Sequence, residues 1–149
     1  MLQQFEISIV QNEYMMYHSI HLPSILDSIH CLDRYVEQIA TALQIKKDKQ
    51  TKMILLLTEA VSNAIKHGNK EDIDKKVTIE CLKKHDNERL CFKVSDEGKG
   101  FNHEQLRNPT EKHNLEIEGG RGVYLIQKMS QGFYFEKNGA CITFICDIN

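Results

Sequence analysis

Glu59 and Asn63 lie one helical turn apart in the stretch LTEAVSNAIKHG, residues 57–68. Asparagine is a poor helix former, so its presence in an apolar helix calls for a reason. A carboxylate can take a proton from a hydroxyl group, and the amide oxygen of asparagine is a neutral ligand for Mg²⁺. Leu55 and Leu56 lie one turn before Glu59, and partial desolvation by leucines makes a carboxylate a stronger base. The pair is therefore a candidate site for proton transfer and metal binding.

The same helix also permits two structural interpretations of the pair. Glu59 could be a surface residue steadied by Lys52 or Lys66, or Glu59 and Asn63 could form a buried pair satisfied by neighbouring backbone. The core face of the helix is predicted on the side opposite Glu59, and it comprises Met53, Ile54, Leu57, Val61, Ala64 and Ile65. The choice between the interpretations depends on the rest of the chain.

Five of the eight glycines lie in two clusters, DEGKGF at 96–101 and EGGRGVYLI at 118–126. Glycine allows a positive φ and a close approach of backbone to a ligand, which suits the hinges of a mobile cover. The second cluster opens a predicted helix, whose exposed N–H groups and dipole favour phosphate. Asp96 ends a predicted strand, where its carboxylate could accept a hydrogen bond from an exocyclic amine such as that of adenine. Each cluster alone is equally typical of an ordinary turn or loop, and the P-loop string GxxxxGK[ST] is absent.

The pattern of apolar residues predicts the elements that must position these groups. Alternation predicts strands at 5–10 and 14–22, and hairpins at 76–85 with 88–96 and at 132–137 with 140–148. Apolar steps of three and four predict helices at 23–43, at 47–67 with Gly68 as a C-terminal cap, and at 121–130. This order predicts an α+β fold, a two-layer α/β sandwich in which about three helices cover one face of a mixed, mostly antiparallel sheet. Residues 102–118 exceed an ordinary connection, and we expect a functional lid or a disordered segment there.

The composition favours one compact domain over the 149 residues, with 41% hydrophobic residues and a formal net charge of −2. Lysine and arginine are scattered, which disfavours direct nucleic-acid binding because phosphate backbones require a basic patch. The first residues lack the pattern of a signal peptide, and no stretch approaches 18 apolar residues. We therefore expect a cytoplasmic protein that does not enter the membrane.

The five cysteines form no CxxC pair, and their odd number argues against a complete disulfide framework. Four of them lie in predicted strands, where cysteine behaves as a small apolar residue: Cys81, Cys91, Cys141 and Cys146. We expect reduced thiols in the core rather than a metal or redox site.

Three motifs follow one another along the chain: E-x-x-x-N on a helix, D-x-G-x-G after a strand, and G-G-x-G at the start of a helix. The strings TEAVSNAIKHGN, VSDEGKGF and EGGRGVYLI carry them. Together they resemble the GHKL ATP-binding superfamily, which has the Bergerat or histidine-kinase-like ATPase fold. In detail the chain is similar to the RsbW-like anti-sigma factor serine/threonine-protein kinases of partner-switching pathways. The resemblance covers nearly the whole of 1–149 and implies a single GHKL ATP-binding kinase domain with an ATP lid at about 102–118.

The resemblance implies a role for each matching residue, with Mg²⁺ and ATP bound between them. Asn63 matches the Mg²⁺ ligand, Glu59 the general base, and Asp96 the residue that reads adenine. Other positions match the nucleotide-binding residues of the family: His67, the hinge glycines Gly98 and Gly100, and Gly119, Gly120, Arg121, Gly122 and Val123 around the phosphates. Asn69 also matches a position near the nucleotide, although helix capping explains it equally well.

The resemblance further implies a serine kinase that phosphorylates a STAS-type antagonist protein and regulates a sigma factor or another target, as a homodimer. The alternative is an ATP/ADP-binding regulatory module that sequesters a partner with little or no kinase activity. The catalytic half of a histidine kinase is disfavoured, because no H-E-x-x-T-P-like phosphoacceptor helix precedes the domain. A chaperone- or topoisomerase-type ATPase would need a second domain, which 149 residues do not supply.

Overall fold

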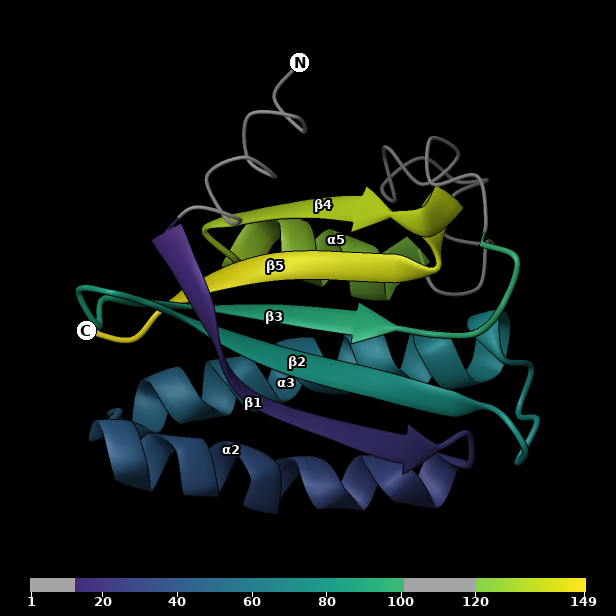
Figure 1. Ribbon diagram of the computed structural model, residues 1–149, viewed down its shortest axis with the longest axis horizontal. Helices are drawn as coiled ribbons and strands as arrows, with labels where there is room; N and C mark the ends of the chain where they lie inside the picture. The colour runs from purple at the N-terminus through teal and green to yellow at the C-terminus, as the bar shows by residue number, and fades with distance from the viewer. Residues whose placement is uncertain (1–12, 101–119) are drawn as a thin grey trace.

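The computed structural model describes residues 13–100 and 120–149 of the chain, and for Gly120 and Arg121 it describes the backbone alone. Figure 1 shows a single sheet with its helices on one side. The strand predicted at 5–10 and the lid predicted at 102–118 lie outside the described residues. The α+β, two-layer architecture predicted from the sequence is confirmed.

The described strands form one five-stranded sheet in the order β1-β2-β3-β5-β4. Their bounds are β1 Tyr14–Pro23, β2 Lys76–Lys84, β3 Arg89–Ser95, β4 Gly132–Glu136 and β5 Cys141–Asp147. All four pairings are antiparallel, so the described sheet is antiparallel throughout rather than mixed. Both predicted hairpins are present, β2 with β3 and β4 with β5. In the second hairpin Asn138 and Gly139 form the turn with φ of 56° and 95°.

Alternation along the strands divides the sheet into two faces. On the helix side, Ile79, Val94 and Ile142 lie side by side across three strands, and the next row contains Cys81, Phe92 and Phe144. These residues are at most 7% exposed and belong to the main core. The helices therefore pack on the face that the apolar alternation predicts.

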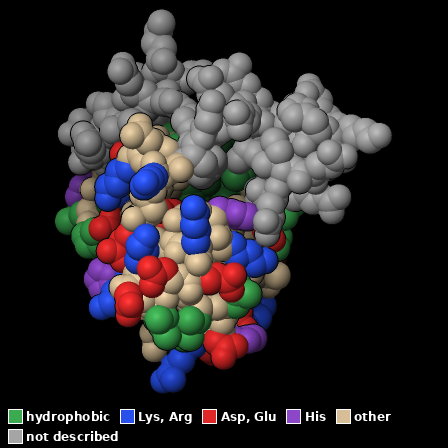
Figure 2. All heavy atoms as spheres, turned by 90° about the vertical axis from the view of Figure 1, so that its right-hand side faces the viewer, with side chains coloured by type: hydrophobic (Ala, Val, Ile, Leu, Met, Phe, Trp, Pro, Cys, Tyr) green, Lys and Arg blue, Asp and Glu red, His purple; other side chains and the backbone are tan. Residues whose placement is uncertain are grey.

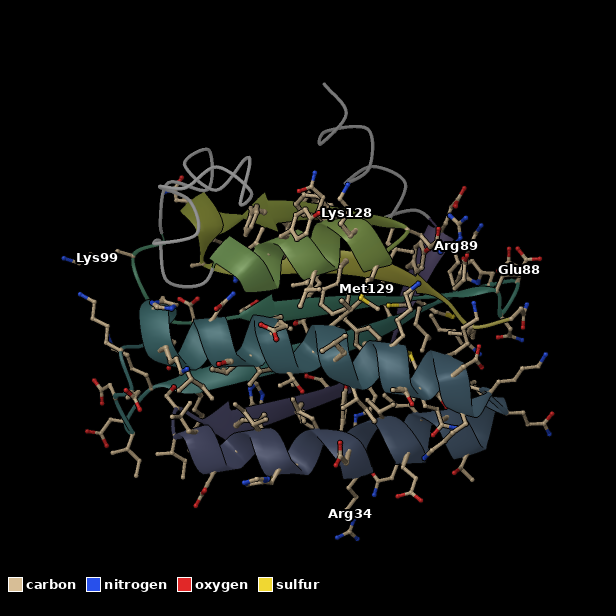
Figure 3. The ribbon with its side chains drawn as sticks, turned by 180° about the vertical axis from the view of Figure 1, so that it is seen from behind. Arg34, Glu88, Arg89, Lys99, Lys128 and Met129 are labelled. Carbon is tan, nitrogen blue, oxygen red and sulfur yellow. The ribbon has the colours of Figure 1, made fainter. Side chains whose placement is uncertain are left out.

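Three helices cover this face: α2 Cys31–Leu43, α3 Lys47–Asn63 and α5 Gly120–Met129. Figure 3 shows them from behind the sheet, with Arg34 pointing away from α2 and Met129 at the boundary between α5 and α3. Each helix buries one apolar stripe, which on α2 consists of Leu32, Tyr35, Val36, Ile39 and Ala40. Packing of this stripe, rather than capping, stabilises α2, because no side chain caps its N-terminus.

The helix predicted at 23–43 is divided into two parts. Leu26–His30 forms a 3₁₀ helix, η1, and the α-helix begins only at Cys31. Ser28 explains the division, because its N–H donates to the Ile25 carbonyl at 3.0 Å and its hydroxyl to the Pro23 carbonyl at 2.8 Å. Such local bonds tighten the first turn and compete with α-helical pairing.

The helix predicted at 47–67 also changes geometry before its end. After Asn63 the chain forms a π-helical turn, η2 Ala64–Gly68, closed by the bond from the Asn69 N–H to the Ala64 carbonyl at 2.8 Å. The helical segment ends at Gly68, where the cap was predicted, and Gly68 ends it without a positive φ. π-turns concentrate at functional sites, and this one lies beside the cavity described below.

The opposite face of the sheet has a smaller apolar cluster of Tyr14, Leu82, Cys91, Tyr134 and Ile145. The four cysteines predicted to be core residues are buried and free, and Cys31 is exposed. Burial raises the pKa of the Cys91 thiol to about 12 and holds it in its neutral form. The predicted burial of these four cysteines is confirmed.

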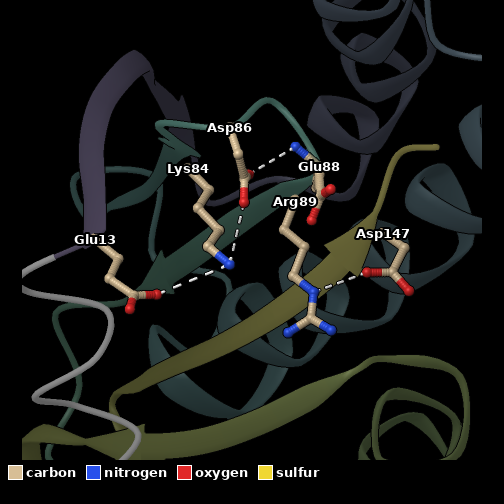
Figure 4. A network of polar contacts seen from close by, with 6 residues as sticks. All are labelled: Glu13, Lys84, Asp86, Glu88, Arg89 and Asp147. Carbon is tan, nitrogen blue, oxygen red and sulfur yellow. Dashed lines mark hydrogen bonds and ion pairs between the residues drawn. The ribbon is translucent and has the colours of Figure 1, made fainter.

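Charged residues fix the far end of the sheet, at the β2–β3 turn (Figure 4). The Arg89 Nε donates to Asp147 Oδ1 at 2.9 Å, which joins β3 to β5. The Lys84 ammonium lies 3.4 Å from Asp86 and 3.9 Å from Glu13. These ion pairs are partly exposed to solvent, which weakens each of them, and they lie at the end of the sheet away from the candidate site.

No helix within 13–100 or 120–149 combines the length and the apolar character needed to cross a lipid bilayer.

Candidate functional site

A cavity lies between the α3–η2 junction, the end of β3, helix α5 and the β4–β5 hairpin. The space among these elements, with the open solvent at its mouth included, is about 330 Å³. Among the described residues that line it, only Asn63 and Asp96 have polar side chains. The others are Ala60, Ala64, Val94, Val123, Ile126, Phe135, Gly139, Ala140 and Ile142. An apolar slot with one carboxylate and one amide suits a flat heterocycle with a polar edge.

Asp96 supplies the carboxylate. Its N–H donates to the Ala140 carbonyl at 2.8 Å, which continues the β3–β5 pairing by one residue. Its Oδ1 accepts the Gly98 N–H at 2.8 Å. Burial raises the pKa of Asp96 above its ordinary value of 3.8, against the Gly98 hydrogen bond and the charge of Lys75, which both lower it. Asp96 is thus a partly desolvated acceptor held at the end of a strand.

Two glycines allow the helix end and the strand end to meet at Asp96. A Cβ at Gly68 would fall on the Asp96 carboxylate, and a Cβ at Gly98 would fall on the Gly68 carbonyl. Gly68 is therefore required for close packing rather than for a left-handed φ. Gly98, which was predicted as a hinge, packs against the Gly68 carbonyl and the Asp96 carboxylate.

Gly100, the second predicted hinge, has a φ of 82°, which favours glycine. A Cβ at this position would collide with the Asn138 carbonyl of the β4–β5 turn. The D-x-G-x-G segment is therefore packed on one side against η2 and on the other against the hairpin that closes the cavity.

Glu59 and Asn63 meet the first turn of α5. A Cβ at Gly122 would lie 2.7 Å from Glu59 Oε2 and 3.1 Å from Asn63 Nδ2. The absence of a side chain at Gly122 lets the acid and the amide approach the helix N-terminus, where N–H groups without helical partners favour anions. Of the two leucines expected to shield Glu59, Leu56 is fully buried in the core and Leu55 is 37% exposed. The core face of α3 is therefore wider than the helical wheel predicts.

The other residues predicted to bind the nucleotide differ in whether they line the cavity. Val123 is 6% exposed and lines the cavity. His67 is half-buried in η2 and is not among the residues that line the described cavity. Gly120 and Arg121 open α5, but their side-chain surroundings lie outside the described residues, as does Gly119.

Sequence reasoning missed the apolar wall formed by Phe135, Ala140 and Ile142, together with Val94 and Ile126. These residues are ordinary members of strands and a helix, and their types carry no signal of a ligand. Register could have found three of them, because Ile142 pairs with both Val94 and Phe135 near the predicted Asp96.

Acidic and basic side chains alternate on the end of the molecule that faces the viewer in Figure 2. Within the described part of this face, positive residues do not gather into a patch. This distribution gives no support to binding of a nucleic-acid backbone here.

The donors at the α3–α5 contact fit Mg²⁺ when water and substrate complete its shell. The described residues contain no group of three or more His, Cys, Asp or Glu able to hold a metal ion by themselves. Mg²⁺ commonly takes one or two protein oxygens and completes its shell with water and substrate phosphates. An amide oxygen of Asn63 next to the Glu59 carboxylate fits this donor set.

Comparison with known proteins identifies the class. The sequence model of the histidine kinase-like ATPase domain matches residues 22–146. The chain therefore belongs to the histidine kinase-like ATPase domain family.

The more specific likeness is to RsbW. Over 98 residues the chain is 29% identical to the serine-protein kinase RsbW of Staphylococcus epidermidis, and the alignment covers 61% of each chain. The same values hold for RsbW from two strains of that species. The chain thus spans about three fifths of the length of the curated relatives it matches.

A solved structure supports the fold independently. The RsbU and RsbW domains of Rv1364c from Mycobacterium tuberculosis match with a TM-score of 0.59 at 11% identity, over 88% of this chain and 32% of that one. At this identity the match supports the fold and not the activity.

Proposed function

We propose that the cavity binds the adenine of ATP, with Asp96 accepting a hydrogen bond from the exocyclic amine. The observation that carries the proposal is the position of the Asp96 carboxylate in a cavity whose other lining residues, among those the structure describes, are apolar apart from Asn63 on α3. Adenine offers a donor edge and two flat apolar faces, which match the carboxylate and the apolar walls. Membership of an ATPase domain family supports the same ligand.

The phosphates of ATP would lie toward the first turn of α5, at Gly120 and Gly122. Backbone N–H groups at a helix start bind phosphate oxygens, and Gly122 has no side chain to obstruct them. We propose further that Arg121, Gly119 and His67 contact the nucleotide, and that residues 102–118 are the ATP lid. Asn63 would hold Mg²⁺, which when bound neutralises charge on the β- and γ-phosphates.

The reaction that this arrangement supports is phosphoryl transfer to a serine hydroxyl. The hydroxyl oxygen attacks the γ-phosphorus, the bond from phosphorus to the β–γ bridging oxygen breaks, and ADP leaves with that oxygen. The proton of the hydroxyl passes to the Glu59 carboxylate, which lies next to Gly122 in the first turn of α5. Glu59 thereby supplies general-base catalysis, and the apolar walls exclude water that would otherwise hydrolyse ATP.

The substrate and partners are proposed from the likeness to RsbW, a serine-protein kinase. We propose a single kinase domain that acts in the cytoplasm as an anti-sigma regulatory factor in a partner-switching pathway. Its substrate would be a STAS-type antagonist, its second partner a sigma factor or another regulated protein, and its functional form a homodimer.

Incubation with γ-labelled ATP, Mg²⁺ and a candidate STAS-domain protein tests the activity. The proposal predicts label on a serine of the antagonist, and loss of transfer with retained ATP binding in Glu59→Gln. Nucleotide-dependent partner binding without transfer in the wild type would instead identify the regulatory module that the sequence also permits.

A further inference from the structure

Asn69 joins three segments that are distant in the sequence. It is 1% exposed and directly follows the π-turn η2. Its Oδ1 accepts the Glu97 N–H at 2.7 Å, and its Nδ2 donates to Ser24 Oγ at 2.7 Å and to the Lys76 carbonyl at 3.0 Å. Both amide hydrogens and the carbonyl oxygen are therefore used. Each bond fixes Asn69 relative to a different element: the turn after β3, the end of β1, and the start of β2.

The backbone adopts unfavourable conformations around Asn69. Lys70 and Glu71 have φ of 52° and 58°, which is the left-handed region that side chains with a Cβ rarely adopt. The wide turn is closed by bonds to the Ala64 and Ile65 carbonyls, both 2.8 Å long. Such conformations persist where surrounding contacts fix them, and they concentrate at functional sites. Here they redirect the chain after Asn69, whose own backbone is right-handed helical with φ of −89° and ψ of −6°.

The hydrogen-bond partners of Asn69 are themselves held by further hydrogen bonds. Ser24 is fully buried, and its hydroxyl, which accepts from Asn69, donates to the Lys75 carbonyl at 2.8 Å. The Lys76 N–H in turn donates to Glu97 Oε2 at 2.6 Å. Glu97 is thus held through its backbone by Asn69 and through its side chain by the start of β2.

Asp96 immediately precedes Glu97. Its own N–H is fixed by the Ala140 carbonyl, and the next N–H is fixed by Asn69. Two fixed peptide groups on either side of one Cα determine the direction of its Cβ. From this geometry we propose that Asn69 is a positioning residue for base recognition, which aims the Asp96 carboxylate at the exocyclic amine of a bound purine. This inference rests on the proposed function only in placing an adenine nucleotide in the cavity.

Two ligands and three variants test the proposal by calorimetry. ADP carries the exocyclic amine, and purine riboside 5′-diphosphate lacks it. Asn69→Ala should weaken ADP binding by roughly tenfold or more, the value of one hydrogen bond to a charged group, and change binding of the amine-free ligand by less than about twofold. The preference for ADP should therefore nearly disappear. Equal losses for both ligands would mean that Asn69 is merely structural and would overturn the proposal.

Ser24→Ala keeps the Asn69 side chain but removes one of its supports, so it should reduce the same preference by a smaller factor. Thermal unfolding shows whether Asn69→Ala is folded. If it is not, the ligand preference of Ser24→Ala tests the proposal instead. Ser28→Ala is the matched control, because Ser28 is 5% exposed in the same β1–η1 junction and its hydroxyl bonds only the Pro23 carbonyl among the contacts described. A preference lost equally in Ser28→Ala would contradict the proposal.

The experiment separates this inference from the proposed function. A wild-type chain that binds neither ligand overturns both. A wild-type chain that prefers ADP, with an unchanged preference in Asn69→Ala and Ser24→Ala, overturns only the role of Asn69.

Discussion

The carboxylate of Asp96 lies directly against the Cα of Gly68, so that a Cβ at Gly68 would fall on the carboxylate carbon. The end of the α3–η2 helix and the end of β3 therefore meet at Asp96, the acidic group among the described residues that line the cavity. Neither element alone defines the site. Its geometry depends on a contact between residues 28 positions apart.

Gly68→Ala should displace Asp96 and weaken ADP binding by roughly tenfold or more, because one methyl group cannot be accommodated without moving the carboxylate. Calorimetric titration with ADP measures the loss, and circular dichroism checks that the fold is retained. Unchanged affinity in the folded variant would show that Asp96 does not contact the nucleotide.

Gly122→Ala should separate catalysis from stability. Alanine is favoured over glycine in a helix by about 1 kcal/mol, so α5 should not be destabilised. The new Cβ would displace Glu59 Oε2, which is 2.7 Å from it and at the end of a flexible side chain. We expect an unfolding temperature equal to or above that of the wild type, with phosphate transfer reduced at least about tenfold. A variant that is stable and fully active would remove Glu59 from the proposed chemistry.

Asn63→Ala should abolish most of the gain in ATP affinity that Mg²⁺ provides. Asn63 is partly exposed at the cavity wall, so the fold should tolerate the change. The measurement is the ratio of ATP dissociation constants with Mg²⁺ and with EDTA, expected to fall roughly tenfold. Ser62→Ala, its half-buried neighbour, serves as the control. An unaltered ratio in Asn63→Ala would exclude Asn63 as the metal ligand.

Asp96→Asn should weaken ADP binding and raise the stability of the folded chain by an amount that depends on pH. Burial raises the pKa of Asp96 in the folded chain above 3.8, the ordinary value expected after unfolding. Below pH 3.8 the group is protonated in both states, and as pH rises through the folded-state pKa the folded chain loses the stability that the bound proton provides. The asparagine side chain of this variant would keep the Gly98 hydrogen bond without the desolvated charge.

The Asp96→Asn variant should therefore unfold at a higher temperature than the wild type at neutral pH, and the difference should vanish below about pH 3.8. Its ADP affinity at neutral pH should fall at least about tenfold. Thermal scans between acidic and neutral pH measure the first effect. A difference that persists or grows as pH falls would contradict the assigned cause.

The sequence predicted the layers of the fold because the apolar periods are strong. Ile79 and Val94 each lie between polar neighbours in their strands, and Ile142 pairs with Val94 on the same face of the sheet. The helix division at Cys31 was not predictable from periodicity, since Ile25 and Ile29 continue the apolar pattern. Local hydrogen bonds of Ser28 override the period there.

The candidate site was predictable where residue types carry chemistry, as at Asp96 and Asn63, which line one cavity. The function of Gly68 was not, because a glycine after a helix is typical of a left-handed cap and only the fold brings Asp96 against it. The role of Asn69 was likewise hidden, since its partners Ser24 and Glu97 are distant in the sequence.

Hydrogen exchange with and without Mg-ADP tests the central claim most directly, because the claim is one of spatial convergence. The account predicts that saturating Mg-ADP slows exchange together in three separate segments: 59–69, 96–98 and 120–126. Exchange of the backbone amides at the far end of the sheet, near the β2–β3 turn, should not change. Absence of any protection at saturating nucleotide, or protection confined to segments outside these three, would contradict the account.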